Sequence, residues 1–143
     1  MGSLYHHLIG ADFRPSDPAT IDKIRQLCSA LPGVSERVSH GEPAWFVGGR
    51  LFATTADHHH DDRLGLWCAA PLGAQEALLS SAPERFFRPP YVGHRGWVGI
   101  YLDAGEPDWG EIAAILEAAH RQVAPRERKR RGPASTGPRP QER

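Results

Sequence analysis

Two glycine-rich stretches limit most strongly what this chain can fold into. In residues 41–53, two apolar runs flank the pair Gly48-Gly49, and in residues 91–102 aromatic residues are interspersed with glycines. Glycine adopts positive φ without steric cost, so a Gly-Gly pair between two strand-forming runs is typical of a tight β-hairpin. The first stretch therefore predicts two antiparallel strands, and the second predicts one long strand.

Amphipathic helices are predicted at both ends of this strand-rich region. Apolar residues recur at helical spacing from Ile21 to Leu31, behind an Asp17-Pro18 pair that suits the N-cap and the first helical position. A second apolar stripe, behind Asp108 as N-cap, runs along the last predicted helix. The remaining elements are two strands and a short helix, predicted over residues 34–38, 63–68 and 73–81.

The order of these elements predicts an α+β domain with two layers. Short connections favour an antiparallel β-sheet, and the N- and C-terminal helices must bury their apolar stripes against one face of it. We expect an irregular N-terminus over residues 1–16, one domain over residues 17–124 and a basic, disordered tail over residues 125–143.

The formal net charge of zero conceals a difference in sign between the domain and its tail. Residues 125–143 hold seven of the 17 basic residues and two of the 17 acidic ones, which gives the tail +5 and leaves −5 on the rest. The basic run Arg128, Lys129, Arg130 and Arg131 predicts salt-dependent, sequence-independent contact with phosphates. The alternative is a solvated terminus that keeps the protein in solution.

Cysteine usage and hydropathy predict a cytoplasmic protein. Cys28 and Cys68, the two cysteines of the chain, are expected as buried, reduced thiols. No apolar run approaches the ~18 residues of a membrane helix. The first residues also lack the basic and apolar segments of a secretory signal. We therefore expect no membrane partner.

Several short motifs, in this order along the chain, resemble the MmcQ/YjbR family of small bacterial proteins. They are a Gly-x-Pro, the Gly-Gly hairpin, a strand beginning Arg-Leu and a Tyr-x-Gly-x-x-x-Trp-Val, at residues 41–43, 46–53, 63–64 and 91–98. The resemblance covers residues 18–124 and implies a frataxin-like (CyaY-like) fold. The family is usually described as DNA-binding through a double wing of two β-hairpins. Some members are associated with antibiotic biosynthesis, which implies a role in resistance or drug binding.

The candidate contacts with nucleic acid are arginines near strand ends and aromatic residues on the predicted long strand. Arg50 and Arg63 lie where hairpins are predicted and would contact phosphates. In a strand, Tyr91, Arg95 and Trp97 share one face, where they would stack a base or a planar ligand. The alternative is that these aromatic residues belong to the core.

Tryptophans on three predicted strands carry a second hypothesis. Trp45, Trp67 and Trp97 could line an apolar cleft between the sheet and the helices. That arrangement predicts a protein that binds or sequesters a planar small molecule, such as a natural product.

Metal binding and catalysis find less support in the sequence. The run His58-His59-His60 offers metal-ligating side chains, but neighbours in a loop do not easily converge, and the defined spacing of a zinc site is missing. His40 and Glu42 can share a face as an acid–base pair, although no nucleophile motif accompanies them. We therefore expect a non-enzymatic binding protein without a metal site or cofactor, and its oligomeric state stays open.

Overall fold

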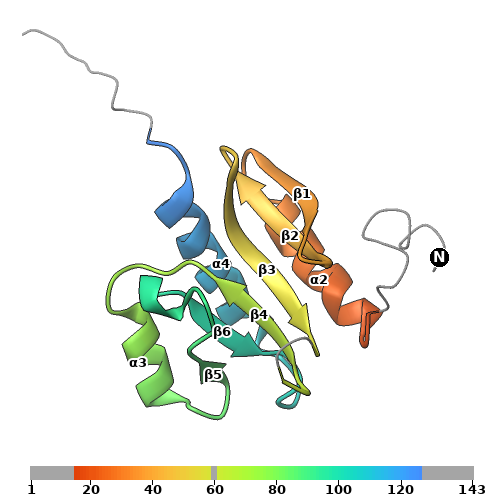
Figure 1. Ribbon diagram of the computed structural model, residues 1–143, viewed down its shortest axis with the longest axis vertical. Helices are drawn as coiled ribbons and strands as arrows, with labels where there is room; N and C mark the ends of the chain where they lie inside the picture. Colours follow the sequence, from red (N-terminus) through yellow and green to blue (C-terminus); the bar gives the residue numbers. More distant parts are fainter. Residues whose placement is uncertain (1–14, 59–60, 127–143) are drawn as a thin grey trace, which may run out of the picture.

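A six-stranded antiparallel sheet, in the order β1-β2-β3-β4-β6-β5, forms the frame of the molecule (Figure 1). The computed structural model describes residues 15–58 and 61–126 of the chain. The strands are β1 Val34–Ser39, β2 Glu42–Val47, β3 Arg50–Asp57, β4 Leu64–Cys68, β5 Phe86–Phe87 and β6 Val98–Tyr101.

Two helices cover one face of this sheet. Helix α2 (Pro18–Ser29) packs behind β1, and α4 (Trp109–Val123) packs behind β3 (Figure 1). The short helix α3 (Ala74–Ser81) lies beside β5 at the edge of the sheet. We call the sheet face opposite α2 and α4 the outer face. The predicted two-layer α+β architecture is therefore confirmed.

Both long helices begin at the predicted caps. The Asp17 side chain accepts a hydrogen bond from the backbone N–H of Thr20, and Pro18 occupies the first turn. The Asp108 side chain accepts one from the backbone N–H of Glu111. These carboxylates satisfy amides that have no partner inside the helix, so the sequence rules place both starts correctly.

The core lies between the helix layer and the sheet. Phe52 of β3 packs its ring edge-on against His120 of α4, with 5.6 Å between the ring centroids. Cys28 and Cys68 are free and buried, as predicted. Burial raises the pKa of the Cys68 thiol to about 12, so this side chain acts as a small apolar residue. The other large buried side chains include Ile21, Ile24, Trp45, Leu66, Val98 and Leu116.

The β2–β3 hairpin forms where the glycine pair predicts it. Gly48 and Gly49 have φ of +59° and +78°, and Val47 pairs with Arg50 across the turn. Arg50 is thereby presented at the tip of the hairpin, exposed to solvent.

The predicted long strand over residues 91–102 is wrong, because strand β6 begins at Val98. Tyr91 follows two prolines and adopts a φ of +68°, and the 3₁₀ helix η1 (Gly93–Arg95) comes next. Gly96 then turns the chain with a φ of +85°. Gly93 and Gly96 thus belong to tight turns rather than to a strand, and alternation along a strand does not relate Tyr91, Arg95 and Trp97.

Candidate functional site

A basic cleft of about 520 Å³ lies where the β2–β3 hairpin, the chain after β4, the chain after η1 and the end of α4 meet. Among the described residues, its lining includes two arginines and no carboxylate. The lining residues are Arg50, Leu51, Ala69, Ala70, Arg95, Trp97, Gln122 and Val123. Three predicted site residues, Arg50, Arg95 and Trp97, therefore meet in one concave surface.

Arg50 and Arg95 carry charges without a carboxylate partner in the part of the chain that the structure describes. Within residues 15–58 and 61–126, neither guanidinium lies within ion-pair distance of a carboxylate. Both residues are exposed, and the Arg95 guanidinium carbon lies 5.6 Å from the centroid of the Trp97 ring. A cation–π contact of this kind orients the cation and leaves its N–H groups free to donate to an anion.

Gln75 of α3 holds the loop that carries Arg95. Its side-chain amide is 4% exposed and donates to the backbone carbonyls of Gly93 and Trp97, at 2.9 and 2.5 Å. Its side-chain oxygen accepts from Arg88 Nη1 at 3.2 Å. The buried amide thus fixes the path of the chain on both sides of Arg95.

A second concavity, which we call the aromatic groove, lies on the outer face over β4, β5 and β6. It has a volume of about 240 Å³. Phe87 and Tyr101 stack in it with 4.4 Å between their centroids. A Cβ atom on Gly99 would lie 2.3 Å from the Phe87 ring, so only glycine lets this ring rest on the strand. Its lining residues are Ala56, Asp61, Arg63, Gly65, Trp67, Phe87, Arg88, Pro90 and Tyr101.

The predicted cleft lined by three tryptophans is wrong. Trp45 is fully buried under the helices, and its Nε1 donates to Glu36 Oε1 at 3.1 Å. Trp97 is 4% exposed and forms a wall of the basic cleft. Trp67, half-buried, lines the aromatic groove on the other face of the sheet. Trp45 is therefore a core residue, and the three indoles do not share a cavity.

Tyr91 lies outside both concavities, on the loop after β5. Its side chain is 73% exposed. The prediction that it shares a stacking face with Arg95 and Trp97 depended on the long strand and is wrong for the same reason.

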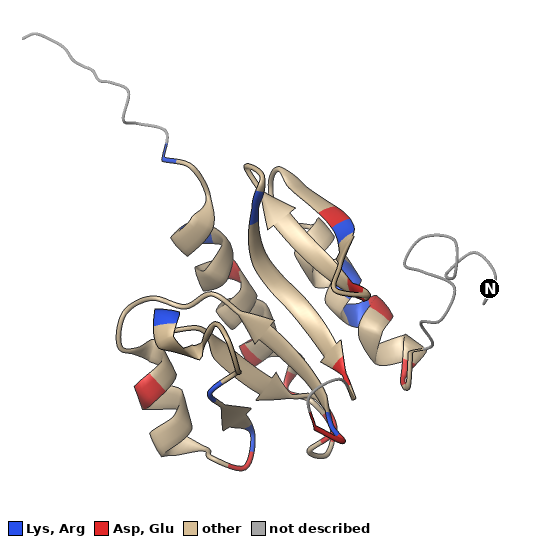
Figure 2. Ribbon diagram, in the orientation of Figure 1, with Lys and Arg blue, Asp and Glu red and all other residues tan. Residues whose placement is uncertain are grey.

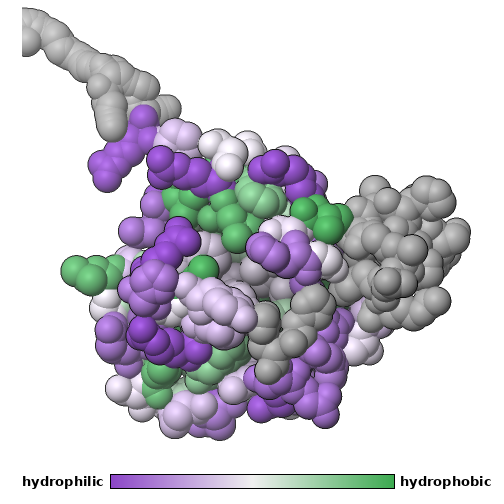
Figure 3. Space-filling model, in the orientation of Figure 1, coloured by the Kyte–Doolittle hydropathy of each residue, from purple (hydrophilic) through white to green (hydrophobic). Residues whose placement is uncertain are grey.

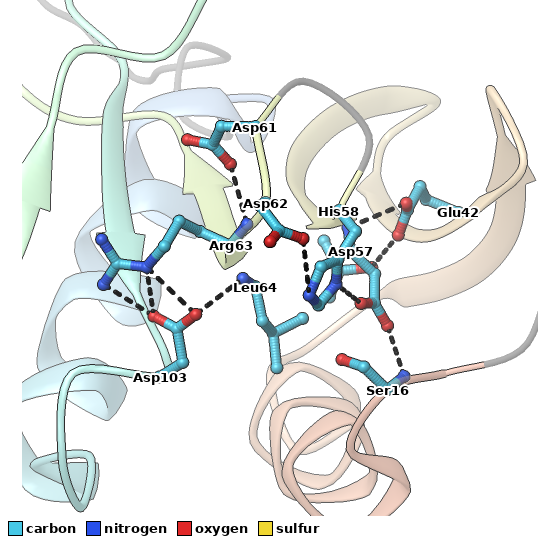
Figure 4. Close-up of polar contacts among 10 residues, drawn as sticks. Ser16, Glu42, Asp57, His58, Asp61, Asp62, Arg63, Leu64 and Asp103 are labelled. Atoms are coloured by element: carbon cyan, nitrogen blue, oxygen red, sulfur yellow. Dashed lines mark hydrogen bonds and ion pairs between the residues drawn. The ribbon is translucent and has the colours of Figure 1, made fainter.

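Arg63 lies at the opposite end of the sheet from Arg50 and is neutralised there. Its Nη2 lies 2.7 Å from Asp103 Oδ1 (Figure 4). Its guanidinium carbon lies 3.8 Å from the centroid of the Tyr101 ring. Asp103 also accepts from the backbone N–H of Leu64 at 3.1 Å. Arg63 therefore anchors the start of β4, and its charge is already satisfied.

The end of β3 carries a network of buried carboxylates beside Arg63 (Figure 4). The carboxylate of Glu42, 3% exposed, accepts hydrogen bonds from the Thr55 hydroxyl at 2.8 Å and the Asp57 backbone N–H at 2.9 Å. Asp57 in turn accepts from the backbone N–H of Ser16 and lies 2.7 Å from His58 Nδ1. Glu42 thus joins β2 to β3, a role the proposed pairing with His40 did not anticipate.

The structure describes His58 but not the rest of its histidine run. His59 and His60 lie outside the described residues. Within the described ranges, no group of three or more His, Cys, Asp or Glu side chains is placed to hold a metal ion.

The hydrogen bond to Asp57 raises the pKa of His58. A raised folded-state pKa means that the protonated imidazole stabilises the fold. This contribution is present below the unfolded pKa of ~6.5 and disappears as the pH rises through the folded value. We expect His58→Asn, which keeps a residue tolerant of the φ of +63°, to lower the free energy of unfolding more at about pH 5.5 than at about pH 8.5.

Urea unfolding at the two pH values measures this difference. His40→Asn is the matched control, because His40 also has a positive φ, +54°, and its ring lies 3.3 Å from the Ser39 hydroxyl. If His58→Asn lowers the free energy of unfolding by the same amount at both pH values, protonated His58 does not stabilise the fold.

A comparison with family models decides the relationship of this chain to known proteins. The YjbR model matches residues 29–122. The chain belongs to the YjbR family. The fold is similar to that in the crystal structure of Deinococcus radiodurans protein DR2400, which has a DUF419 domain. That similarity has a TM-score of 0.60 and 22% identity, and it covers 70% of this chain and 75% of the other. The search of curated proteins gave no match.

In this YjbR-family protein the charges divide between the two ends of the sheet (Figure 2). Carboxylates gather around the β3–β4 loop, whereas the opposite tip of the β2–β3 hairpin carries Arg50. The tail begins at that basic end, because Pro125 lies so close to the hairpin that a Cβ on Gly48 would be 2.6 Å from its Cγ. The predicted phosphate contacts of Arg128, Lys129, Arg130 and Arg131 lie outside the described residues. Among the helices that the structure describes, none is long and apolar enough to span a bilayer.

Sequence reasoning did not single out Gln75, which holds the Arg95 loop of this YjbR-family chain, or Phe87 and Arg88, which line the aromatic groove. Gln75 carries no sequence signal, because an amide in a short helix is usually exposed. Phe87 and Arg88 lie between prolines, and the two-residue strand β5 is too short for an alternating pattern to reveal. The signal that could have located Phe87 is Gly99, since a glycine inside a strand often marks close approach of another group.

Proposed function

We propose that this YjbR-family protein is a binding protein for nucleic acid and that phosphates occupy the basic cleft. The observation that carries the proposal is the meeting of Arg50 and Arg95 in one cleft whose described lining has no carboxylate. Guanidinium groups donate paired hydrogen bonds to phosphate oxygens, and an uncompensated pair attracts a polyanion.

The positions of the charged side chains also favour binding of a polyanion at the end of the sheet that carries the basic cleft. The domain without its tail is acidic overall, which opposes binding of nucleic acid. The carboxylates of the β3–β4 loop lie at the far end of the sheet from Arg50, however (Figure 2). At physiological salt, charges separated by more than ~8 Å of solvent are largely screened. The cleft end is therefore able to bind phosphates, and the basic tail that starts beside it adds to the attraction.

Binding across a salt series tests the proposal. We expect the full chain to bind an oligonucleotide, with an affinity that falls steeply as salt rises, because each neutralised phosphate releases a counterion. The slope of log affinity against log salt is about −0.7 to −0.9 for each phosphate contacted. Fluorescence anisotropy of a labelled oligonucleotide measures it. An absence of binding at low salt would contradict the proposal.

Binding of a small planar molecule remains the second candidate, and the aromatic groove is the observation that favours it. Trp67, Phe87 and Tyr101 offer ring surfaces beside two arginines. Quenching of tryptophan fluorescence by a planar ligand, insensitive to salt, would support this candidate over the first.

A further inference from the structure

The aromatic groove holds three aromatic side chains beside glycines on the outer face of the sheet. Trp67 pairs with Gly99 and Gly65 pairs with Tyr101 across β4 and β6. Paired residues point to the same face of a sheet, so Trp67 and Tyr101 each lie beside a glycine, which has no side chain. Trp67, Phe87 and Tyr101 are all half-buried. The Tyr101 ring lies between Phe87 and the Arg63 guanidinium, so Trp67 and Phe87 are the rings against which a flat ligand would stack.

Hydrophobic side chains also continue across the outer face beyond the groove. Figure 3 looks onto this face and shows hydrophobic side chains gathered over β2 and β3, between hydrophilic margins. Phe46 pairs there with Leu51, and the guanidinium carbon of Arg37 lies 3.8 Å from the centroid of the Phe46 ring. Rings with arginines beside them therefore occur at more than one place on the sheet surface.

The size of the groove and its charge favour a small, uncharged ring. Its volume, about 240 Å³, lies below the ~300–1,000 Å³ of sites for drug-sized ligands. Arg63 is neutralised by Asp103, and Asp61 lines the groove with Arg88. The groove is therefore close to neutral, unlike the basic cleft, and suits a base better than a phosphate.

Residues that line the groove and residues that line the basic cleft are close neighbours in sequence along and after β4. Gly65 and Trp67 of β4 line the groove, and Ala69 and Ala70, directly after β4, line the cleft. Extended chain rises ~3.3 Å per residue, so Trp67 and Ala70 lie about 10 Å apart. One nucleotide chain can thus place a phosphate in the cleft and a nearby base in the groove.

We propose that the aromatic groove stacks an unpaired nucleobase, so that the protein prefers single-stranded over double-stranded nucleic acid. This inference rests on the proposed function, because the phosphates of the same strand occupy the basic cleft. Bases inside a duplex are stacked on both faces and cannot enter the groove. Stacking on aromatic side chains tolerates any base, because every base offers a flat π-face.

Replacement of Trp67 by leucine tests the inference in the full chain. The probes are a labelled oligothymidylate of about 12 nucleotides, within the ~4–16 nucleotides that single-strand binders cover, and a duplex of the same length. We expect the wild type to bind the single strand more tightly, and Trp67→Leu to lower that affinity about tenfold while duplex affinity stays unchanged. Trp67→Phe, which keeps a ring, is expected to restore most of the affinity.

Trp109→Leu is the matched control, because Trp109 is a half-buried tryptophan in the helix layer. It should change neither affinity. Equal binding of single strand and duplex, with no effect of Trp67→Leu, would overturn the inference and leave the proposed function standing. Binding of neither probe at low salt would overturn both.

Discussion

Replacing Arg50 and Arg95 together by glutamine is expected to lower the affinity for nucleic acid about 100-fold at ~0.1 M salt. Each guanidinium makes charge-assisted hydrogen bonds worth ~1.5–3 kcal/mol, and ~1.4 kcal/mol corresponds to a tenfold change in affinity. The two residues share the basic cleft, and within the described residues neither is engaged by a carboxylate. Anisotropy titrations at one salt concentration measure the loss.

The matched control removes the same net charge from the helix layer. Lys23 is exposed on α2, in the helix layer on the other side of the sheet from the outer face. Lys23→Glu changes the net charge by the same two units and is expected to change the affinity only slightly, because long-range attraction is screened by salt. A loss as large as that of the cleft variant would show that net charge, rather than the cleft, governs binding.

Trp45→Ala is expected to destabilise the protein by ~3–5 kcal/mol without acting on a ligand. Trp45 is fully buried, and its Nε1 donates to Glu36. Removing the indole leaves a cavity under α2 and deprives that carboxylate of one donor. Because small domains are stable by only ~5–15 kcal/mol, the midpoint of urea unfolding should fall sharply.

Trp45→Phe separates stability from binding. It fills much of the space, so the loss of stability should be smaller, and the folded variant should bind nucleic acid as the wild type does. Weaker binding by folded Trp45→Phe, measured well below its unfolding midpoint, would contradict the assignment of Trp45 to the core.

Local sequence signals predicted those parts of the fold that local chemistry determines. Asp17 and Asp108 begin helices because a side-chain carboxylate can satisfy the first free amides. The Gly48-Gly49 pair fixes a hairpin because both positions require positive φ. The prediction of a strand over residues 91–102 was wrong because glycines also occur in tight turns. The two prolines before Tyr91 begin such a turn.

The candidate site was predictable only in part, because it depends on register and on which sheet face the helices cover. Alternation along a strand assigns side chains to two faces without saying which one is buried. Trp45 pairs with Ala53 on the face under the helices, whereas Trp67 pairs with Thr54 on the outer face. Arg50 and Arg95 were each visible as exposed cations, but their meeting in one cleft follows from the tertiary fold.

The most direct test of the basic cleft compares two full-length chains with a chain ending at Arg126, which keeps the contact of Pro125 with the hairpin. Binding of one labelled oligonucleotide is measured across a salt series for wild type, the Arg50→Gln/Arg95→Gln variant and the shortened chain. The account predicts that the shortened chain still binds, with a reduced salt slope, and that the double variant loses most of its affinity. Unchanged binding by the double variant, together with loss of binding in the shortened chain, would contradict it and assign binding to the tail alone.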